Sequence, residues 1–268
     1  MPIFMDRHDA GELSAEDVAE LHLKDLELQD RYGAKFLTYW YDKARRTTFC
    51  LVDAPDRETV NQVHAEAHGQ VAHEITPVDL SAVEAFLGRI QDPPTAKTKP
   101  IDESGFRSIM FTDMVGSTEM TARLGDAGAV ELVRVHDSIV RRCLKRFGGS
   151  EVKHLGDGIM ASFREAPDAV LCAIRIQEEF ATYNAHSEIP LRIRIGLHAG
   201  EPVEESDDLF GSAVQMTSRI CDVAEAGTVF VSREIKDACV GSDLTFDSQG
   251  TRSLKGFAEP VELYSAAQ

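Results

Sequence analysis

Apolar and polar residues over positions 1–90 follow two different periodicities, which predict a small unit of mixed strands and helices. Short apolar stretches predict strands at 2–5, 34–41, 47–52 and 74–78. Two segments with apolar residues at every third or fourth position predict helices over 14–32 and 54–68, and a glycine follows each. The order βαββαβ is typical of a ferredoxin-like sandwich of two helices on a four-stranded antiparallel sheet.

A polar segment with three prolines interrupts this pattern, so residues 91–104 predict a linker between two domains, 1–90 and 105–268. In the second domain, strands are expected at 107–111, 191–197 and 228–232, and a hairpin at 151–163. Helices are expected to begin near 118, 167 and 212. The order βαββαβ thus occurs twice, and the sequence predicts an α+β protein with two ferredoxin-like domains.

Composition and charge limit the classes of function. The 43% of hydrophobic and 27% of charged residues are those of a globular protein. No apolar run approaches the roughly 18 residues that cross a membrane. The net charge of −17 disfavours nucleic acid or an anionic membrane as a partner, because either needs a basic surface. The five cysteines lack CxxC spacing, which favours reduced thiols, so we expect a cytoplasmic protein that binds neither partner.

Two acidic positions suggest phosphate chemistry. Asp113 ends a predicted strand, and residues 115–117 turn the chain into a helix whose first N–H groups can bind an anion. A carboxylate repels a phosphate, so the arrangement is explained if a divalent cation lies between them. Asp157, at the tip of the predicted hairpin, supplies a second carboxylate. Taken alone, Asp157 is better explained by an Asp-Gly turn, and residues 116–118 by an ordinary helix N-cap.

The segment FTDMVGST at 111–118, followed by KHLGDG at 153–158, resembles the catalytic core of the class III adenylate and guanylate cyclases. Further motifs follow in the order of that family: RIGLHAG at 194–200, DLFG at 208–211 leading to Ser218-Arg219, and LKGF at 254–257. The resemblance covers about residues 105–268 and implies a palm-like catalytic domain. It assigns Asp113 and Asp157, with Met114 beside them, to two Mg²⁺ or Mn²⁺ ions. The residues that it assigns to the substrate phosphates are Val115, Gly116, Ser117 and Thr118.

The same resemblance assigns the remaining site residues. Lys153 and Asp208 fall on the positions that select the purine, where a lysine donor and an aspartate acceptor complement the edge of adenine but not that of guanine. Lys255 is expected to bind the terminal phosphates, and Arg219 to stabilise charge on the α-phosphate. Gln215 stands where the family commonly has asparagine. Its extra methylene displaces the amide, which predicts low activity or a reshaped site.

The resemblance implies an adenylate cyclase that converts ATP to 3′,5′-cyclic AMP and pyrophosphate. In this family the metal-binding aspartates and the base-selecting residues meet across a head-to-tail dimer interface, so a homodimer with two sites is expected. Two alternatives stay open: a nucleotide-binding regulator with little or no activity, and a metal sensor whose cyclase domain is an output module. GTP is the less favoured substrate.

Five of the nine histidines lie in the first domain. His64 and His68 share one side of the second predicted helix, and His22 points inward from the first. Hydrogen-bonded core histidines explain this pattern, and so does a site for Ni, Zn or Cu that Glu74 could also join. MDRH at 5–8 and HAEAHG at 64–69 are among the motifs that resemble a small family of uncharacterised bacterial domains with a nickel-binding member, over about residues 1–80. The candidate ligands are His8, His22, His64, His68, Asp6 and Cys50.

Overall fold

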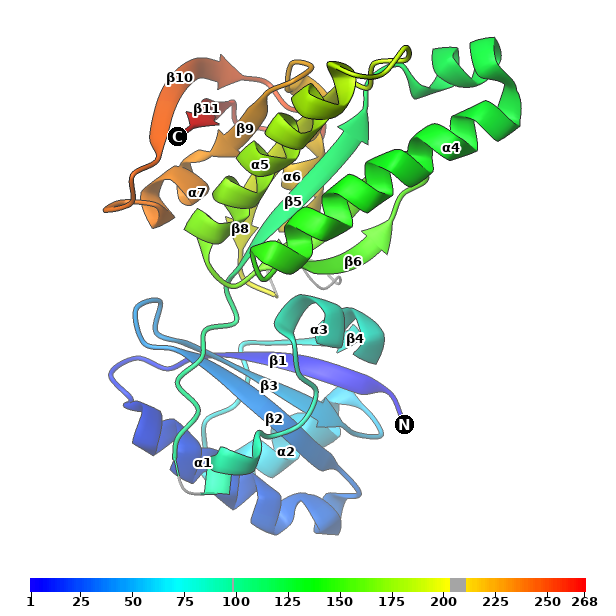
Figure 1. The fold of residues 1–268 in the computed structure, drawn as a ribbon. Helices are drawn as coiled ribbons and strands as arrows, with labels where there is room; N and C mark the ends of the chain where they lie inside the picture. The colour runs from blue at the N-terminus through cyan, green and yellow to red at the C-terminus, as the bar shows by residue number, and fades with distance from the viewer. Residues whose placement is uncertain (98, 203–210) are drawn as a thin grey trace. The chain divides into compact units, whose positions relative to one another are not determined.

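The computed structural model describes residues 1–97, 99–202 and 211–268 of the chain. These residues form two compact units: Met1–Phe106 with residues 201, 202 and 211, and Arg107–Gly200 with Ser212–Gln268. Each unit has its own β-sheet and its own buried hydrophobic residues (Figure 1). Within the described ranges, no helix combines the length and the apolar character needed to cross a membrane.

The first unit is built on a four-stranded antiparallel sheet with the strand order β2-β3-β1-β4. Its elements are β1 (Ile3–Asp9), α1 (Ala15–Leu28), β2 (Lys35–Asp42), β3 (Thr47–Asp53), α2 (Arg57–Ala67), β4 (Glu74–Val78) and α3 (Leu80–Leu87). Helices α1 and α2 pack side by side on one face of the sheet (Figure 1). The predicted ferredoxin-like sandwich is therefore confirmed.

Side-chain caps fix where the helices of this unit begin. The Ser14 hydroxyl accepts from the Asp17 N–H, and the Asp17 carboxylate accepts from the Ser14 N–H at 2.8 Å, which forms a capping box. At α2 the Asp56 carboxylate accepts from the Thr59 N–H, and at α3 the Asp79 carboxylate accepts from the N–H groups of Ser81 and Ala82. The sequence pattern did not predict α3, because its eight residues span too few turns to establish a helical period.

The segment predicted to be a linker packs against the first unit. The Asp92 N–H donates to the Leu37 carbonyl at 3.0 Å, and the Tyr41 N–H donates to the Glu103 carbonyl at 2.9 Å. The segment therefore follows the open edge of β2, the outermost strand of the sheet. Ile101 lies in the hydrophobic core of this unit. Composition could not reveal this packing, because an edge strand offers backbone groups that pair with almost any sequence.

The second unit contains a seven-stranded sheet with the order β10-β11-β9-β8-β5-β7-β6. Its strands are β5 (Arg107–Met114), β6 (Ser150–His154), β7 (Ile159–Phe163), β8 (Ile193–Gly200), β9 (Val229–Ser232), β10 (Thr245–Arg252) and β11 (Val261–Ala267). Its helices are α4 (Ser117–Arg146), α5 (Ala166–Asn184), α6 (Gly211–Val223) and α7 (Arg233–Ala238). The order β8-β5-β7-β6 repeats the arrangement of the first unit, so the second predicted βαββαβ core is confirmed as well.

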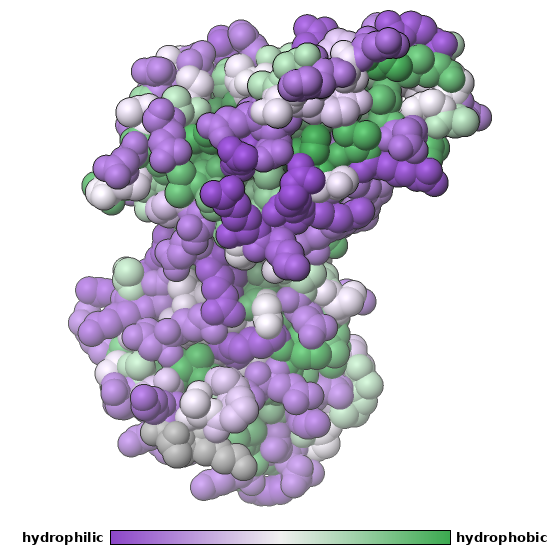
Figure 2. Space-filling model, viewed as in Figure 1, coloured by the Kyte–Doolittle hydropathy of each residue, from purple (hydrophilic) through white to green (hydrophobic). Residues whose placement is uncertain are grey.

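Strand β5 is central in this sheet and is paired along its length with β8. Its other neighbour, β7, pairs only as far as Phe111. Ile109 and Met110 in its middle are completely buried, whereas Asp113 near its C-terminal end is about 30% exposed. In Figure 2 the viewed surface is largely hydrophilic, as the net charge of −17 leads one to expect, and hydrophobic residues gather along α4. The open C-terminal end of β5 is thus the place where polar side chains of the sheet become accessible.

Candidate active site and candidate metal centre

The C-terminal end of β5 and the turn between β6 and β7 bring the two predicted aspartates together. The Met114 N–H, next to Asp113, donates to the Asp157 carbonyl at 3.3 Å. Gly158 lies so close to β5 that a Cβ atom there would be 2.1 Å from the Thr112 carbonyl oxygen. Only glycine permits this approach. The β6–β7 turn is therefore fixed against β5 with both carboxylates at the same end of the sheet.

The two carboxylates influence each other electrostatically. Burial raises the pKa of Asp113, and the charges of Asp157 and Asp222 raise it further. The Arg194 guanidinium, on the neighbouring strand β8, donates to Asp113 Oδ2 at 2.7 Å and partly offsets these effects. Arg194 is placed there by strand register, because it pairs directly with Asp113 in the β5–β8 ladder. The site thus concentrates negative charge that a cation can stabilise.

The chain after Asp113 forms the predicted turn into a helix. Gly116 has a φ of 75°, a left-handed conformation that favours glycine, and α4 begins at the next residue. The Ser117 hydroxyl donates to Asp157 Oδ2, which links the start of α4 to the β6–β7 turn. A groove of about 470 Å³ lies here. Its lining includes Ser117, Thr118, Met120, Ala129, Leu132 and Asp157. A carboxylate pair, a helix N-terminus and a groove therefore occur in one place.

The remaining predicted residues lie elsewhere in the second unit. Lys153 is exposed on β6, the edge strand. Gln215 is exposed on α6, and Arg219 on the same helix donates to Asp222 Oδ2 at 2.8 Å. Lys255 is exposed between β10 and β11. Asp208, the second residue predicted to select the purine, lies outside the described residues.

The donor atoms at the carboxylate pair suit a hard divalent cation. Asp113 and Asp157 offer carboxylate oxygens, and backbone carbonyl groups adjoin them, which are the ligands that Mg²⁺ and Mn²⁺ prefer. The raised pKa of Asp113 reflects unfavourable negative charge in a half-buried place, and a bound cation would relieve it. The residues present therefore fit the ions that the sequence implies.

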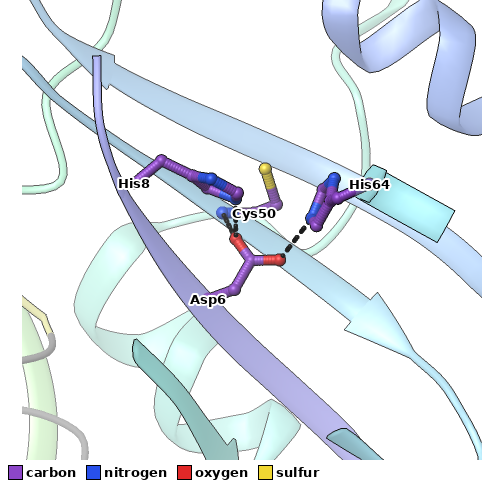
Figure 3. A group of neighbouring side chains, drawn as sticks. All are labelled: Asp6, His8, Cys50 and His64. Carbon is purple, nitrogen blue, oxygen red and sulfur yellow. Dashed lines mark hydrogen bonds and ion pairs between the residues drawn. The ribbon is translucent and has the colours of Figure 1, made fainter. Parts of the chain in front are cut away.

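A second cluster of ligand atoms lies in the first unit (Figure 3). Asp6, His8, Cys50 and His64 are buried, and one ligand atom from each lies within 4.8 Å of the others. Asp6 pairs with Cys50 across the β1–β3 ladder, so their side chains share a face of the sheet. His8, two residues along β1, is on the same face, and α2 supplies His64 above it. Two imidazoles, a thiol and a carboxylate suit Ni, Zn or Cu.

Without a metal, charge pairing holds this cluster together. His64 Nε2 lies 2.9 Å from Asp6 Oδ2, and its Nδ1 lies 3.1 Å from Asp25 Oδ1, so both ring nitrogens face carboxylates. Burial opposes the charged imidazolium, but Asp6 and Asp25 outweigh it and raise the pKa of His64. Burial, reinforced by Asp6, raises the pKa of the Cys50 thiol. A metal ion that binds here must therefore displace protons.

The other predicted ligands divide between two places. His68 belongs to a second group with Asp25 and His64, in which His68 Nε2 lies 3.2 Å from Asp25 Oδ1. A cavity of the first unit is lined by residues of both groups, among them His8, Cys50, His64 and His68. His22 also lines this cavity but belongs to neither group, and its Nε2 lies 3.1 Å from Asp92 Oδ2. Glu74 is likewise in neither group of the described residues. Sequence reasoning missed Asp25, although an aspartate one helical turn after His22 on the inward face of α1 was a usable signal.

Comparisons with known proteins follow the division into two units. The family described as "Adenylate and Guanylate cyclase catalytic domain" matches residues 100–267, and the family described as "Nickel responsive protein SCO4226-like" matches residues 4–78. Among similar proteins, serine/threonine-protein kinase pkn2 of Myxococcus xanthus is 28% identical over 161 residues, which is 59% of this chain and 19% of the kinase. The adenylate cyclase of Neurospora crassa is 31% identical over 156 residues, 49% of this chain and 7% of that protein. The chain therefore spans less than a fifth of the length of these relatives.

Solved structures resemble the second unit. The adenylyl cyclase CyaB from P. aeruginosa has a TM-score of 0.53 at 22% identity, and the match covers 61% of this chain and 94% of CyaB. The guanylate cyclase domain of RhGC from Catenaria anguillulae, solved in complex with GTP, has a TM-score of 0.54 at 20% identity, with 62% and 98% covered. At these identities the likeness shows the fold. Together with the family match over most of its length, it shows that this chain belongs to the adenylate and guanylate cyclase catalytic domain family.

Proposed function

We propose that this protein is an adenylate cyclase that converts ATP to 3′,5′-cyclic AMP and pyrophosphate. The observation that carries the proposal is the meeting of Asp113 and Asp157 beside the start of α4. The carboxylates suit Mg²⁺ or Mn²⁺, and the helix N-terminus suits a triphosphate. Two such ions, when bound, lower the pKa of the attacking hydroxyl and neutralise phosphate charge.

The residues of the chain have the following proposed roles. The N–H groups of residues 116–118 bind phosphate oxygens while the ribose 3′-oxygen attacks the α-phosphorus in line and pyrophosphate leaves. The Val115 N–H, which the sequence also assigns to the phosphates, donates to the Arg192 carbonyl at 2.9 Å. Arg219 stabilises the charge that develops on the α-phosphate. To do so, its guanidinium releases the Asp222 carboxylate and donates to the phosphate instead. Gln215, one helical turn earlier on α6, orients the ribose, and its extra methylene compared with asparagine lowers the rate.

Strand directions support a site shared between two chains. From β5 through β8 and β9 to β11, pairing is antiparallel, parallel and antiparallel, so β11 begins at the end of the sheet opposite to Asp113. Lys255 precedes β11 and therefore lies about 20 Å from Asp113 along the strands and about 14 Å across them. A lysine side chain does not bridge this span. We therefore propose a head-to-tail homodimer in which Lys255 of one chain reaches the triphosphate held by the other.

We further propose ATP rather than GTP as the preferred substrate. Lys153 is exposed, so its ammonium is available as a donor to the base of a nucleotide. Lys153→Glu reverses the polarity of this group and should lower the ratio of cyclic AMP to cyclic GMP formed from equal ATP and GTP. An unchanged ratio would refute the role of Lys153 in base selection.

The direct test is product formation by the purified protein with Mn²⁺ and ATP. Cyclic AMP and pyrophosphate should appear in equal amounts, and Asp113→Ala or Asp157→Ala should abolish both while circular dichroism stays unchanged. Asp247→Ala is the matched control, because Asp247 is an exposed carboxylate on β10. Tight binding of ATP without product in the wild type would instead support the nucleotide-binding regulator, in which Gln215 has ended turnover. If the protein is such a regulator, Gln215→Asn should not restore cyclic AMP formation.

For the first domain we propose regulation of the cyclase by a transition metal such as nickel, with residues 1–90 as sensor, 91–104 as connection and 105–268 as catalytic domain. The buried cluster of Asp6, His8, Cys50 and His64 supports metal binding. Contacts of the connecting segment support signalling. Two residues that line the cavity, His22 and Tyr39, form hydrogen bonds with this segment. His22 Nε2 pairs with the Asp92 carboxylate, and the Tyr39 hydroxyl accepts from the Ile101 N–H at 2.9 Å.

The regulatory proposal is tested by nickel binding and activity measured side by side. One equivalent of Ni²⁺ should bind to the wild type and change its cyclase rate, and His64→Gln should lose both effects. His73→Gln is the control, because His73 is exposed and lies outside both ligand groups of the described residues. Equal responses of the wild type and His64→Gln would refute the proposed sensor.

A further inference from the structure

A single buried hydroxyl joins the two strand ends that carry Asp113 and Asp157. Thr112, the residue before Asp113, is 2% exposed. Its Oγ1 accepts from the Ile159 N–H at 3.0 Å, and Ile159 is two residues after Asp157. The same Oγ1 lies 3.1 Å from Nε2 of His136 on α4, a side chain with no exposed surface. The Thr112 hydroxyl therefore connects β5, β7 and α4 immediately behind the carboxylate pair.

The directions of these hydrogen bonds follow from counting protons. His136 Nδ1 lies 3.0 Å from Asp137 Oδ1, which fixes the ring proton on Nδ1 and leaves Nε2 as an acceptor. Thr112 then donates its hydroxyl proton to Nε2 at 3.1 Å in preference to the Ile159 carbonyl at 3.5 Å, and its lone pair accepts from the Ile159 N–H. Burial lowers the pKa of His136, so the imidazole is neutral as this scheme requires. Ile159, Thr112 and His136 thus donate one after another, and the Asp137 carboxylate accepts the last of these hydrogen bonds.

We propose that Thr112 and His136 are positioning residues, which hold the β5 and β7 ends in register so that Asp113 and Asp157 bind their cations together. The inference rests on the proposed function, because it concerns the metal-binding role of those two aspartates. Neither residue touches substrate. They act by fixing the backbone on which the carboxylates stand, much as buried partners orient the ligands of a metal site.

The location of the bond distinguishes this role from ordinary core stability. In the β5–β7 ladder, regular pairing ends at Phe111 with Met160. The Thr112 side chain continues the connection by one more residue, where the regular ladder has ended and a longer hydrogen bond follows from the Met114 N–H to the Asp157 carbonyl at 3.3 Å. Losing the bond therefore loosens the active end of the ladder and leaves its buried middle paired. The effect is expected on cation binding more than on global unfolding.

The test compares Thr112→Val, which keeps the shape of the side chain but removes the hydroxyl, with Thr112→Ser, which keeps the hydroxyl. Mn²⁺ binding is measured by electron paramagnetic resonance with a non-hydrolysable ATP analogue, and amide exchange at Ile159 is measured by mass spectrometry. Thr112→Val should weaken Mn²⁺ binding about tenfold and speed this exchange, in line with losses seen for partners of metal ligands. Thr112→Ser should stay within twofold of the wild type. His136→Phe should resemble Thr112→Val, because it removes the acceptor.

Thr76→Val measures the general cost of this substitution, since Thr76 is a completely buried strand threonine of the first unit. It should leave Mn²⁺ binding unchanged. Equal Mn²⁺ binding by the wild type and Thr112→Val would overturn the positioning role while the proposed cyclase function stood. A wild-type protein that binds no Mn²⁺ with the analogue would refute the proposed function, and the positioning role with it.

Discussion

The close approach of Gly158 to β5 makes Gly158→Ala a sharp perturbation of the proposed active site. The new Cβ atom would lie 2.1 Å from the Thr112 carbonyl oxygen, so the two backbones must separate by about 0.9 Å to restore even the 3.0 Å lower limit of real contacts. Asp157 precedes Gly158 and moves with it, whereas Asp113 follows Thr112 and does not. A displacement of about 1 Å between catalytic groups can cost roughly a hundredfold in rate. Overpacking of this kind also lowers the free energy of unfolding by about 1–3 kcal/mol.

The assay is the initial rate of cyclic AMP formation with saturating Mn²⁺ and ATP, next to a thermal unfolding curve. Gly158→Ala should lose on the order of a hundredfold in rate while it still unfolds cooperatively. Gly148→Asn is the matched control, because Gly148 has a φ of 69° and open space around its Cβ position, and asparagine tolerates this conformation. A folded Gly158→Ala protein whose rate stays within threefold of the wild type would refute the claim that the distance between the two carboxylates controls activity.

Three further predictions concern charge. Cys50→Ser should weaken Ni²⁺ binding by at least about tenfold, measured by calorimetry, because it replaces a soft thiolate ligand. Because the pKa of His64 is raised above its ordinary value of 6.5, the protonated imidazole stabilises the folded, metal-free protein. This stabilisation is fully present below pH 6.5 and is lost as the pH rises through the raised pKa. The unfolding temperature of the first unit should therefore fall in alkaline solution, and His64→Gln should remove that fall. Arg194→Gln removes the group that lowers the pKa of Asp113, so the acid limb of the pH–rate profile should move to higher pH; an unmoved limb would contradict this.

The order of secondary structure was predictable because it depends on local periodicity. The strand–helix order of both units follows from apolar spacing, and the capping box at Ser14 marked the start of α1 in the sequence itself. Helix α3 and the packing of residues 91–104 along β2 were not predictable in this way. One is too short to show a period, and the other depends on backbone hydrogen bonds that leave no pattern in the side chains.

The candidate site was predictable only in part, for a related reason. Asp113 and Asp157 stand at turns, where their motifs are contiguous in sequence and easily seen. The partners of these residues come from strand register and from packing between distant segments. Arg194 faces Asp113 because β8 pairs with β5 at that position, and Thr112 meets His136 because α4 crosses behind the strand. Asp25 joins His64 in the first unit by the same kind of contact.

The central claim is that Asp113 and Asp157 hold a pair of divalent cations beside a bound triphosphate. A crystal structure with Mn²⁺ and a non-hydrolysable ATP analogue, with anomalous diffraction used to locate manganese, tests it most directly. The account predicts two manganese peaks about 3.5–4 Å apart, both within coordination distance of these carboxylates and of phosphate oxygens. Bound nucleotide with manganese elsewhere, or with the Asp113 and Asp157 carboxylates making no contact to it, would contradict the account.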